Sequence, residues 1–279
     1  MFRRLLLPVV LGRIDAPALR VAAALSQAFD AELGVLVGLS TVSPLLAGWE
    51  YFPTGVYDTM AETARAAASA LARDVRAQLA DTGAAHDVIE DGSLWLTPAE
   101  QALPHAFVAD LVVHGRTAQP QDAERSLFAA LLLSSGRPLL LVPPGEPPTA
   151  FERIVVAWKP TREATRALHD ALPLLQRARS IDLLTVGSSP GAAEGPPSRD
   201  HEPADAVVAH LALHGVTATA SHVARGDGTS RAILAFARER GAELIVAGGY
   251  GRSRVSEQVF GGVTRVLFEH AEVPVLFSH

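Results

Sequence analysis

The strongest chemical signal in the chain is a glycine-rich segment, GGYGRSRVSEQVFGG. Gly248, Gly249 and Gly251 follow the apolar run ELIVA, and Gly261 and Gly262 precede the helix-like segment VTRVLFEHA. Free backbone N–H groups in a glycine turn form an anion-binding concavity. A helix N-terminus offers further unpaired N–H groups and a partial positive charge. Two such donor clusters can hold a polyphosphate between them.

This segment matches neither of two common phosphate-binding motifs. A P-loop ends in Lys followed by Ser or Thr, and a dinucleotide-binding turn has the pattern GxGxxG. The residues Arg252, Arg254 and Arg265 lie close by in the sequence and can add positive charge. The alternative interpretation is structural, because glycines also allow a helix and a sheet to pack closely. An anion site and a simple tight loop therefore both stay open.

Two other patterns favour structure over chemistry. GSSPG fits the G-x-S-x-G nucleophile elbow around Ser189, but that elbow needs a helix directly after the serine. A proline-rich loop follows instead, so hydrolase chemistry is disfavoured. His210 and His214 have metal-ligand spacing but lack a companion glutamate or an evident third ligand. We interpret them as solvent-exposed histidines and predict no metal site. Thr161 is the expected N-cap of a helix that Arg162 and Glu163 open.

Composition narrows the class of protein. The 279 residues suffice for two domains, with 48% apolar and 19% charged residues, as in globular proteins. A net charge of −6 without a basic tract argues against nucleic acid or anionic membranes as partners. The lack of cysteine excludes disulfides and thiol chemistry. MFRRLLLPVVLGR is broken by Pro8 and has no cleavage site, so we expect a buried strand and a cytoplasmic protein.

The sequence contains an internal duplication. FRRLLLPVV matches FERIVVAWK, ADLVVHG matches AELIVAG, and RPLLLV matches VPVLFS, in the same order in both halves. The segment PPGEPPTA cannot continue a helix or a strand, so it is the expected linker. We therefore predict two domains, residues 1–146 and 151–279.

Each half alternates short apolar runs with segments of helical period. Strands that are apolar along their whole length and separated by helices indicate a parallel sheet covered on both faces. We predict an α/β fold of two tandem doubly wound domains, each with five parallel strands. The expected strands span residues 3–11, 32–38, 84–90, 110–115 and 138–143, and then 153–158, 181–187, 217–223, 243–248 and 273–278. Such a sheet binds ligands beyond the carboxyl ends of its strands.

The spacing Gly248-x2-Gly251-x9-Gly261, followed by Gly262-Val263-Thr264, resembles the nucleotide-binding motif of universal stress proteins. ADLVVHGR and AELIVAGG look like the fourth strand of that family, and RPLLLVP and VPVLFSH look like its fifth. The resemblance covers nearly the whole chain as two copies. It implies a Rossmann-like domain per copy and an intrachain pseudo-dimer, with further homodimerisation left open. It also implies ATP, with Mg²⁺, as the ligand to expect.

The resemblance assigns a set of nucleotide-binding residues in the second half. They are Gly248, Gly249, Gly251, Arg252, Gly261, Gly262, Val263, Thr264, Val186 and Lys159. Val186 corresponds to a position that touches adenine in the family. Two of these positions depart from the family pattern. Gly262 stands where Ser or Thr helps to hold phosphate, and Lys159 stands near an acidic residue that contacts the nucleotide. Lysine can meet a phosphate but cannot replace a carboxylate that accepts hydrogen bonds or holds a metal.

The first half departs further, because no glycine follows HGR until Gly136. We expect no nucleotide there and a packing role for this copy. The function expected overall is that of a stress-response binding or regulatory protein with an adenine-nucleotide site in the second half. A nucleotide-free scaffold, a binder of another small molecule and a slow ATPase are the alternatives. We assign no catalytic residue, so whether the protein is an enzyme stays open.

Overall fold

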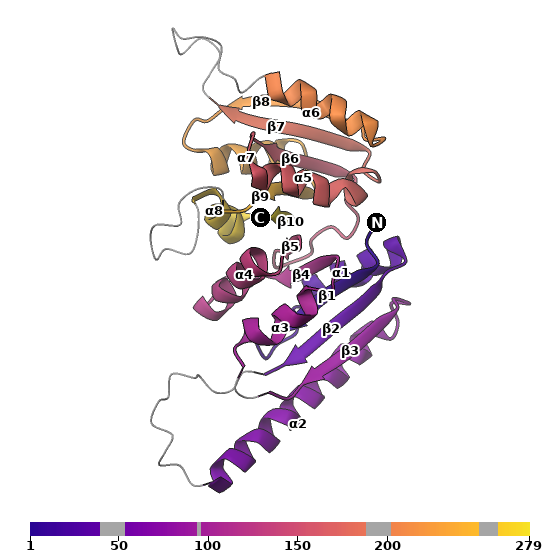
Figure 1. The fold of residues 1–279 in the computed structure, drawn as a ribbon, viewed down its shortest axis with the longest axis vertical. Coiled ribbons are helices and arrows are strands. Elements are labelled where there is room, and N and C mark those ends of the chain that lie inside the picture. The colour runs from indigo at the N-terminus through magenta and orange to yellow at the C-terminus, as the bar shows by residue number, and fades with distance from the viewer. Residues whose placement is uncertain (40–53, 94–95, 188–201, 251–261) are drawn as a thin grey trace. The chain divides into compact units, whose positions relative to one another are not determined.

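The computed structural model describes residues 1–39, 54–93, 96–187, 202–250 and 262–279. Within this described part, strands and helices alternate along the chain (Figure 1), with ten strands and eight helices. The predicted α/β class is therefore confirmed, and each half contributes five strands. The chain divides into two compact units, Met1–Arg137 (unit 1) and Pro138–His279 (unit 2).

Unit 1 holds a parallel sheet with the strand order β3-β2-β1-β4. Its elements in chain order are β1 (Arg4–Val9), α1 (Ala16–Phe29), β2 (Glu32–Gly38), α2 (Thr54–Leu79), β3 (His86–Asp91), α3 (Pro98–Ala106), β4 (Leu111–Gly115) and α4 (Asp122–Ser134). The central strands β1 and β4 are apolar and almost fully buried, whereas the edge strand β3 is half-exposed. This is the burial expected of a sheet covered by helices.

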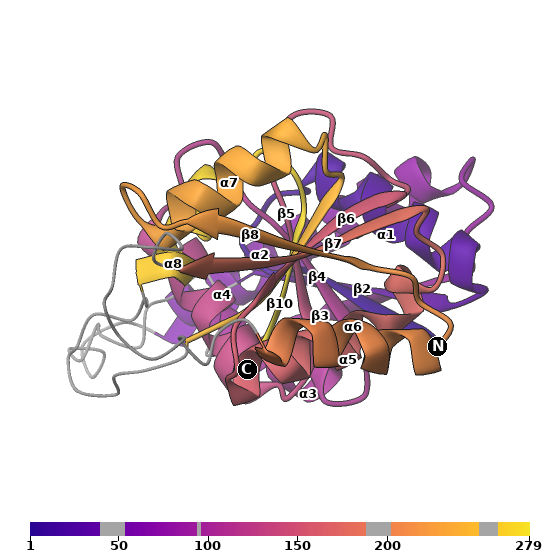
Figure 2. The ribbon, with the colours of Figure 1, turned by 90° about the horizontal axis from the view of Figure 1, so that it is seen from above.

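Unit 2 holds a sheet with the strand order β5-β10-β9-β6-β7-β8. Its elements are β5 (Leu139–Val142), β6 (Arg153–Trp158), α5 (Arg162–Leu175), β7 (Ser180–Gly187), α6 (Glu202–Leu213), β8 (Thr219–Ala224), α7 (Thr229–Glu239), β9 (Leu244–Gly248), α8 (Gly262–His270) and β10 (Val275–Ser278). The helices α5 and α6 cover one face, and α7 covers the other with α8 packed against it (Figure 2). The sheet is thus doubly wound.

Strand β5 lies in unit 2, although the sequence repeat assigns it to the first half. It pairs antiparallel with β10, with Leu140 opposite Leu276. Both strands are fully buried, and the other neighbouring strands of unit 2 run parallel. The last strands of the two repeats therefore bond to each other. This pairing covers the edge of β10, which would otherwise offer unpaired backbone groups.

An N-cap residue fixes the start of α5 and of α1. Thr161 is the N-cap of α5, as predicted, and its hydroxyl accepts a hydrogen bond from the Ala164 N–H. Asp15 caps α1 in the same way and accepts from the Ala18 N–H at 3.0 Å. Each cap fixes the start of the first helix of its unit beside the end of a central strand. In the described part of the chain, no helix is long and apolar enough to span a bilayer.

Candidate functional site

A pocket of about 280 Å³ opens at the carboxyl ends of the parallel strands in unit 2. Its walls come from the ends of β6, β7 and β9 and from the first turns of α5, α7 and α8. Central strands of a parallel sheet deliver their last residues to one edge, so segments far apart in the sequence converge there. The pocket lies at the edge at which the sequence predicts ligand binding.

The structure brings six of the predicted site residues to this pocket. They are Lys159, Val186, Gly248, Gly262, Val263 and Thr264. Gly249 is not part of the lining. Gly251, Arg252 and Gly261 lie outside the described residues.

Gly248 has a packing role. A Cβ at this position would lie 2.6 Å from the Ala164 nitrogen and 2.7 Å from the Glu163 carbonyl carbon. Both contacts are with the backbone of α5, which cannot give way cheaply. For Gly248 the structural interpretation therefore holds, because only glycine lets the end of β9 lie against the start of α5. Gly262 differs, since a Cβ there would meet nothing within 4 Å.

The first glycine cluster does not provide the donors expected of it at two positions. The Gly249 N–H donates to the Ser278 carbonyl at 2.8 Å. Tyr250 has a left-handed backbone with φ 57°, and its N–H donates to the Thr264 hydroxyl at 3.2 Å. These two N–H groups satisfy acceptors within the protein, and so they are not directed to a ligand. The buried Thr264 side chain holds this turn by accepting the Tyr250 N–H.

The N-terminus of α8 is the second predicted donor cluster, and it borders the pocket. Gly262, Val263 and Thr264 form its first turn, and all three line the cavity. The first N–H groups of an α-helix have no acceptor inside the helix. The helix dipole adds a partial positive charge at this end. Together these features favour an anionic group at the α8 side of the pocket.

Charged side chains add to this positive potential. Lys159 at the end of β6 and Arg225 directly after β8 both line the pocket and are exposed. The Arg225 N–H donates to the Gly187 carbonyl at 2.8 Å, which holds this loop beside the end of β7. Glu163 is the only carboxylate among the described lining residues, and it forms an ion pair with Arg162 at 3.7 Å. The charges that face the cavity are mainly positive.

Part of the pocket lining is apolar. Leu184, Val186 and Ile233 contribute aliphatic surface, and the buried Trp158 borders it. Sequence reasoning selected only Val186 of these residues and did not select Arg225. Arg225 follows the expected strand 217–223 closely, so the rule that ligands bind at strand ends can identify it. Ile233 lies on the second turn of α7, and only the packing of that helix brings it to the site.

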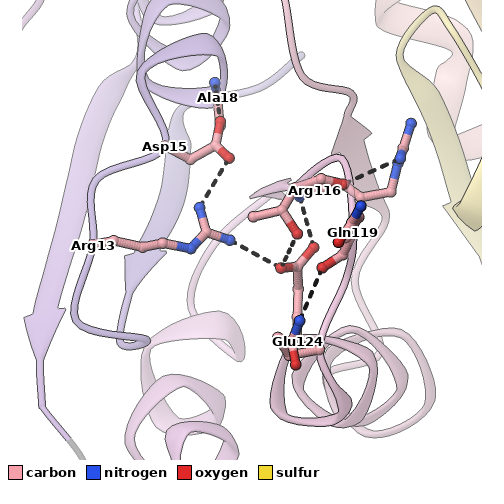
Figure 3. A network of polar contacts seen from close by, with 8 residues as sticks. Arg13, Asp15, Ala18, Arg116, Gln119 and Glu124 are labelled. Carbon is pink, nitrogen blue, oxygen red and sulfur yellow. Dashed lines mark hydrogen bonds and ion pairs between the residues drawn. The ribbon is translucent and has the colours of Figure 1, made fainter.

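At the corresponding edge of unit 1, the described residues leave little open space. A cavity of only about 20 Å³ remains at the ends of β1 and β4. Gly115 ends β4 as Gly248 ends β9, and a Cβ there would collide with the Asp15 side chain. Arg13 lies between two carboxylates (Figure 3), 3.4 Å from Asp15 and 2.9 Å from Glu124. Glu124 also accepts from the Thr117 N–H at 2.8 Å and from its hydroxyl at 2.9 Å.

Burial shifts the titration of this network. Burial raises the pKa of Asp15, although the Ala18 N–H and Arg13 oppose the shift. Burial lowers the pKa of His114 to about 4, and the nearby Arg13 guanidinium adds to the decrease. His114 is therefore neutral at pH 7. Unit 1 thus holds a cluster of paired polar side chains at the position of the unit 2 pocket.

The remaining candidates from the sequence are Ser189 and the histidine pair. Ser189 lies outside the described residues. The rings of His210 and His214 are 4.7 Å apart, and His169 of α5 lies 5.2 Å from His210, a neighbour that only the packing of α5 on α6 reveals. His214 is exposed as predicted, but His210 is half-buried because it faces α5. Nowhere in the described chain are three or more His, Asp or Glu side chains arranged to hold a metal ion.

Comparisons with known proteins place this fold. Residues 150–279 match the sequence pattern of the universal stress protein family. A universal stress protein from Archaeoglobus fulgidus DSM 4304 aligns over 99% of this chain and 95% of its own, with 18% identity and a TM-score of 0.70. A candidate universal stress protein from Pseudomonas aeruginosa UCBPP-PA14 aligns over 99% and 93%, with 14% identity and a TM-score of 0.59.

Shorter members of the family also match. A universal stress protein in complex with cAMP aligns over 47% of this chain and 98% of its own, with 18% identity and a TM-score of 0.37. No curated protein sequence matches this chain significantly. Residues 150–279 therefore carry a universal stress protein domain, and the whole chain shares the fold of these two longer structures.

Proposed function

We propose that unit 2 binds one adenine nucleotide per chain and that the protein acts as a stress-response binding or regulatory module. The observation that carries this proposal is one pocket whose lining combines aliphatic and positively charged groups. Leu184, Val186 and Ile233 supply aliphatic surface, and Lys159, Arg225 and the start of α8 supply positive charge. A nucleotide presents a matching pair of surfaces, a flat, largely apolar base and an anionic phosphate chain.

The size of the pocket favours a nucleotide held partly at the surface. Its volume of about 280 Å³ is close to the lower limit of the usual range for small-molecule sites, about 300 Å³. A base and ribose can occupy the interior, while the phosphates extend toward the first turn of α8. In this orientation the helix N-terminus meets the phosphates, as at other anion sites.

The lining favours binding over turnover. Efficient phosphoryl transfer uses a positioned base or water-orienting group together with metal ligands. Glu163 is the only described acidic residue in the lining, and Arg162 partly neutralises it. We therefore propose a nucleotide-responsive binding module whose hydrolysis of ATP, if measured, is slow.

Calorimetric titration of the full-length protein with ATP and with adenosine tests the proposal, and Gly262→Glu is the informative variant. The space around Gly262 is open, and an acidic residue suits a helix N-terminus, so the variant should fold well. Its carboxylate would repel phosphate at the α8 end. We expect one ATP per wild-type chain and a loss of at least about tenfold in ATP affinity, or 1.4 kcal/mol. The affinity for adenosine should change little.

Gly262→Gln is the matched control, because it has almost the same shape without the charge. It should bind ATP much more tightly than Gly262→Glu does. If ATP and adenosine both fail to bind wild-type protein that was freed of bound ligand by unfolding and refolding, the nucleotide proposal is wrong. Two equivalent ATP sites per chain would contradict the assignment to unit 2 alone.

A further inference from the structure

Lys159 is the only lysine in the chain, and the other 23 basic residues are arginines. This single lysine lines the unit 2 pocket at the end of β6. The two cations differ in their chemistry. Arginine is a planar fork that suits two parallel hydrogen bonds, whereas the lysine ammonium is a compact point charge on a flexible stem. The pocket therefore contains the only side chain of the sequence that ends in a compact ammonium group on a flexible stem.

The strand register places Lys159 beside the glycine segment. Ala157 of β6 pairs with Ala247 of β9. When this parallel register is continued by two residues, past the ends of both strands, Lys159 is level with Gly249. The N–H groups of Gly249 and Tyr250 are bonded within the protein. Among the described lining residues, positive charge for a polyphosphate therefore comes from Lys159, Arg225 and the start of α8.

The described lining residues do not fit a divalent cation held by the protein. Mg²⁺ prefers carboxylate and carbonyl oxygens in octahedral geometry. Among the described lining residues only Glu163 carries a carboxylate, and Arg162 lies 3.7 Å from it. Within the described ranges there is also no cluster of three His, Asp or Glu side chains suited to a metal. A Mg²⁺ ion on the phosphates would, in addition, lie in the repulsive field of Lys159 and Arg225.

We propose that the Lys159 ammonium takes the place of a divalent metal ion as counter-charge, so that the pocket binds metal-free nucleotide. This inference rests on the proposed function and names the charge state of its ligand. Metal-free ATP carries more negative charge than its Mg²⁺ complex, and the pocket offers two cations and a helix N-terminus to meet it.

Titration of the full-length protein with ATP in two buffers of equal ionic strength tests the inference. One buffer contains EDTA, and the other contains excess Mg²⁺. We expect the wild type to bind ATP at least as tightly in EDTA as in Mg²⁺. Lys159→Gln should weaken ATP binding in EDTA by about tenfold or more, the loss expected for one charge-assisted hydrogen bond. It should change adenosine binding less than about twofold, since adenosine has no phosphate.

Two further variants sharpen the test. Lys159→Asp introduces the carboxylate that can hold a metal, so ATP binding should now depend on Mg²⁺. Arg179→Gln is the matched control, because it removes one exposed positive charge next to the start of β7, outside the pocket. It should leave both ATP affinities unchanged. Far-UV circular dichroism of each variant verifies the fold, and Lys159→Gln alone suffices if Lys159→Asp does not fold.

The outcomes separate this inference from the proposed function. If the wild type binds adenosine and binds ATP only with Mg²⁺, the metal-free inference is wrong and the nucleotide site stands. Unchanged ATP affinity of Lys159→Gln in EDTA would also overturn the role of Lys159. If neither ATP nor adenosine binds in either buffer, the proposed function itself fails, and this inference fails with it.

Discussion

The two units differ at the same position of their fold, where a central strand ends beside the first helix. In both, a glycine ends a central strand beside the start of the first helix, Gly115 in unit 1 and Gly248 in unit 2. The Asp15 side chain occupies the space next to Gly115, whereas the backbone of α5 lies next to Gly248. Beside these glycines, the described residues line a cavity of about 20 Å³ in unit 1 and a pocket of about 280 Å³ in unit 2.

This difference shows that paired charged side chains, and not only apolar ones, can fill one copy of a duplicated site. In unit 1 both Asp15 and Glu124 pair with Arg13, so the charge of this arginine is directed to the protein's own carboxylates. In unit 2 Lys159 and Arg225 face the cavity. Buried polar networks hold one arrangement when every member has a partner. The choice between an empty and a filled site thus depends on where the carboxylates lie.

The largest expected effect comes from removing β5 from unit 2. We predict that the fragment 138–279 folds cooperatively, whereas 151–279 aggregates or melts lower by about 5 °C or more. The reason is that the shorter fragment leaves the buried edge of β10 without its partner strand. Thermal melts and size-exclusion chromatography of the two fragments measure the difference. Equal melting temperatures and monomeric behaviour of both fragments would show that β5 is dispensable.

Breaking the filled site should destabilise unit 1 without converting it into a binding site. Glu124→Ala removes the acceptor of the Thr117 N–H and hydroxyl and one of the two carboxylates that face Arg13. We expect a loss of about 2 kcal/mol in the free energy of unfolding, measured with urea, because the part-buried Thr117 donors lose their partner. Glu272→Ala is the control, because its ion pair with Arg238 has the same 2.9 Å distance but is exposed. It should cost less than about 1 kcal/mol.

If Glu124→Ala bound a second ATP per chain, the filled site alone would be what prevents binding in unit 1. We expect the stoichiometry of ATP to stay at one per chain, since unit 1 lacks a lysine and a glycine-rich helix start.

His114 should make unit 1 sensitive to acid. Its folded pKa of about 4 lies below the ordinary value of 6.5, so the unfolded chain binds more protons between these values. Stability should therefore fall as the pH falls from 7, by about 2 kcal/mol at pH 5 from this residue. Urea unfolding of the wild type and of His114→Leu at both pH values isolates the effect. The same pH dependence in the variant would rule His114 out as the cause.

The smallest expected effect is a modest gain in ATP affinity at the unit 2 pocket. Gly262→Ser adds a hydroxyl at the α8 end of the pocket, where a Cβ meets nothing within 4 Å. We predict a gain of about 0.5 to 1.5 kcal/mol in the binding free energy of ATP, the net value of one hydrogen bond. Gly262→Ala serves as the control for the added Cβ. If both variants bind ATP with the same affinity, the hydroxyl does not reach the phosphate.

Apolar runs and glycine spacing in the sequence predicted most of the fold but only part of the site. The apolar runs that become β1, β6 and β9 need no tertiary information, because a strand buried on both faces is apolar throughout. The site residues in or next to the glycine segment followed from sequence spacing. Arg225 and Ile233 did not, since β8 and α7 reach the pocket only through the winding of the sheet.

The sequence by itself determined the duplication, the α/β class, the cap at Thr161 and the loss of the glycine motif from the first half. These properties depend on residue type and spacing within one segment. Tertiary structure alone decided that β5 pairs with β10, that Asp15 and Glu124 close the site of unit 1, and that Gly248 serves packing. Each of these depends on atoms brought together from distant segments, and a contact of that kind leaves no periodic signal in the chain.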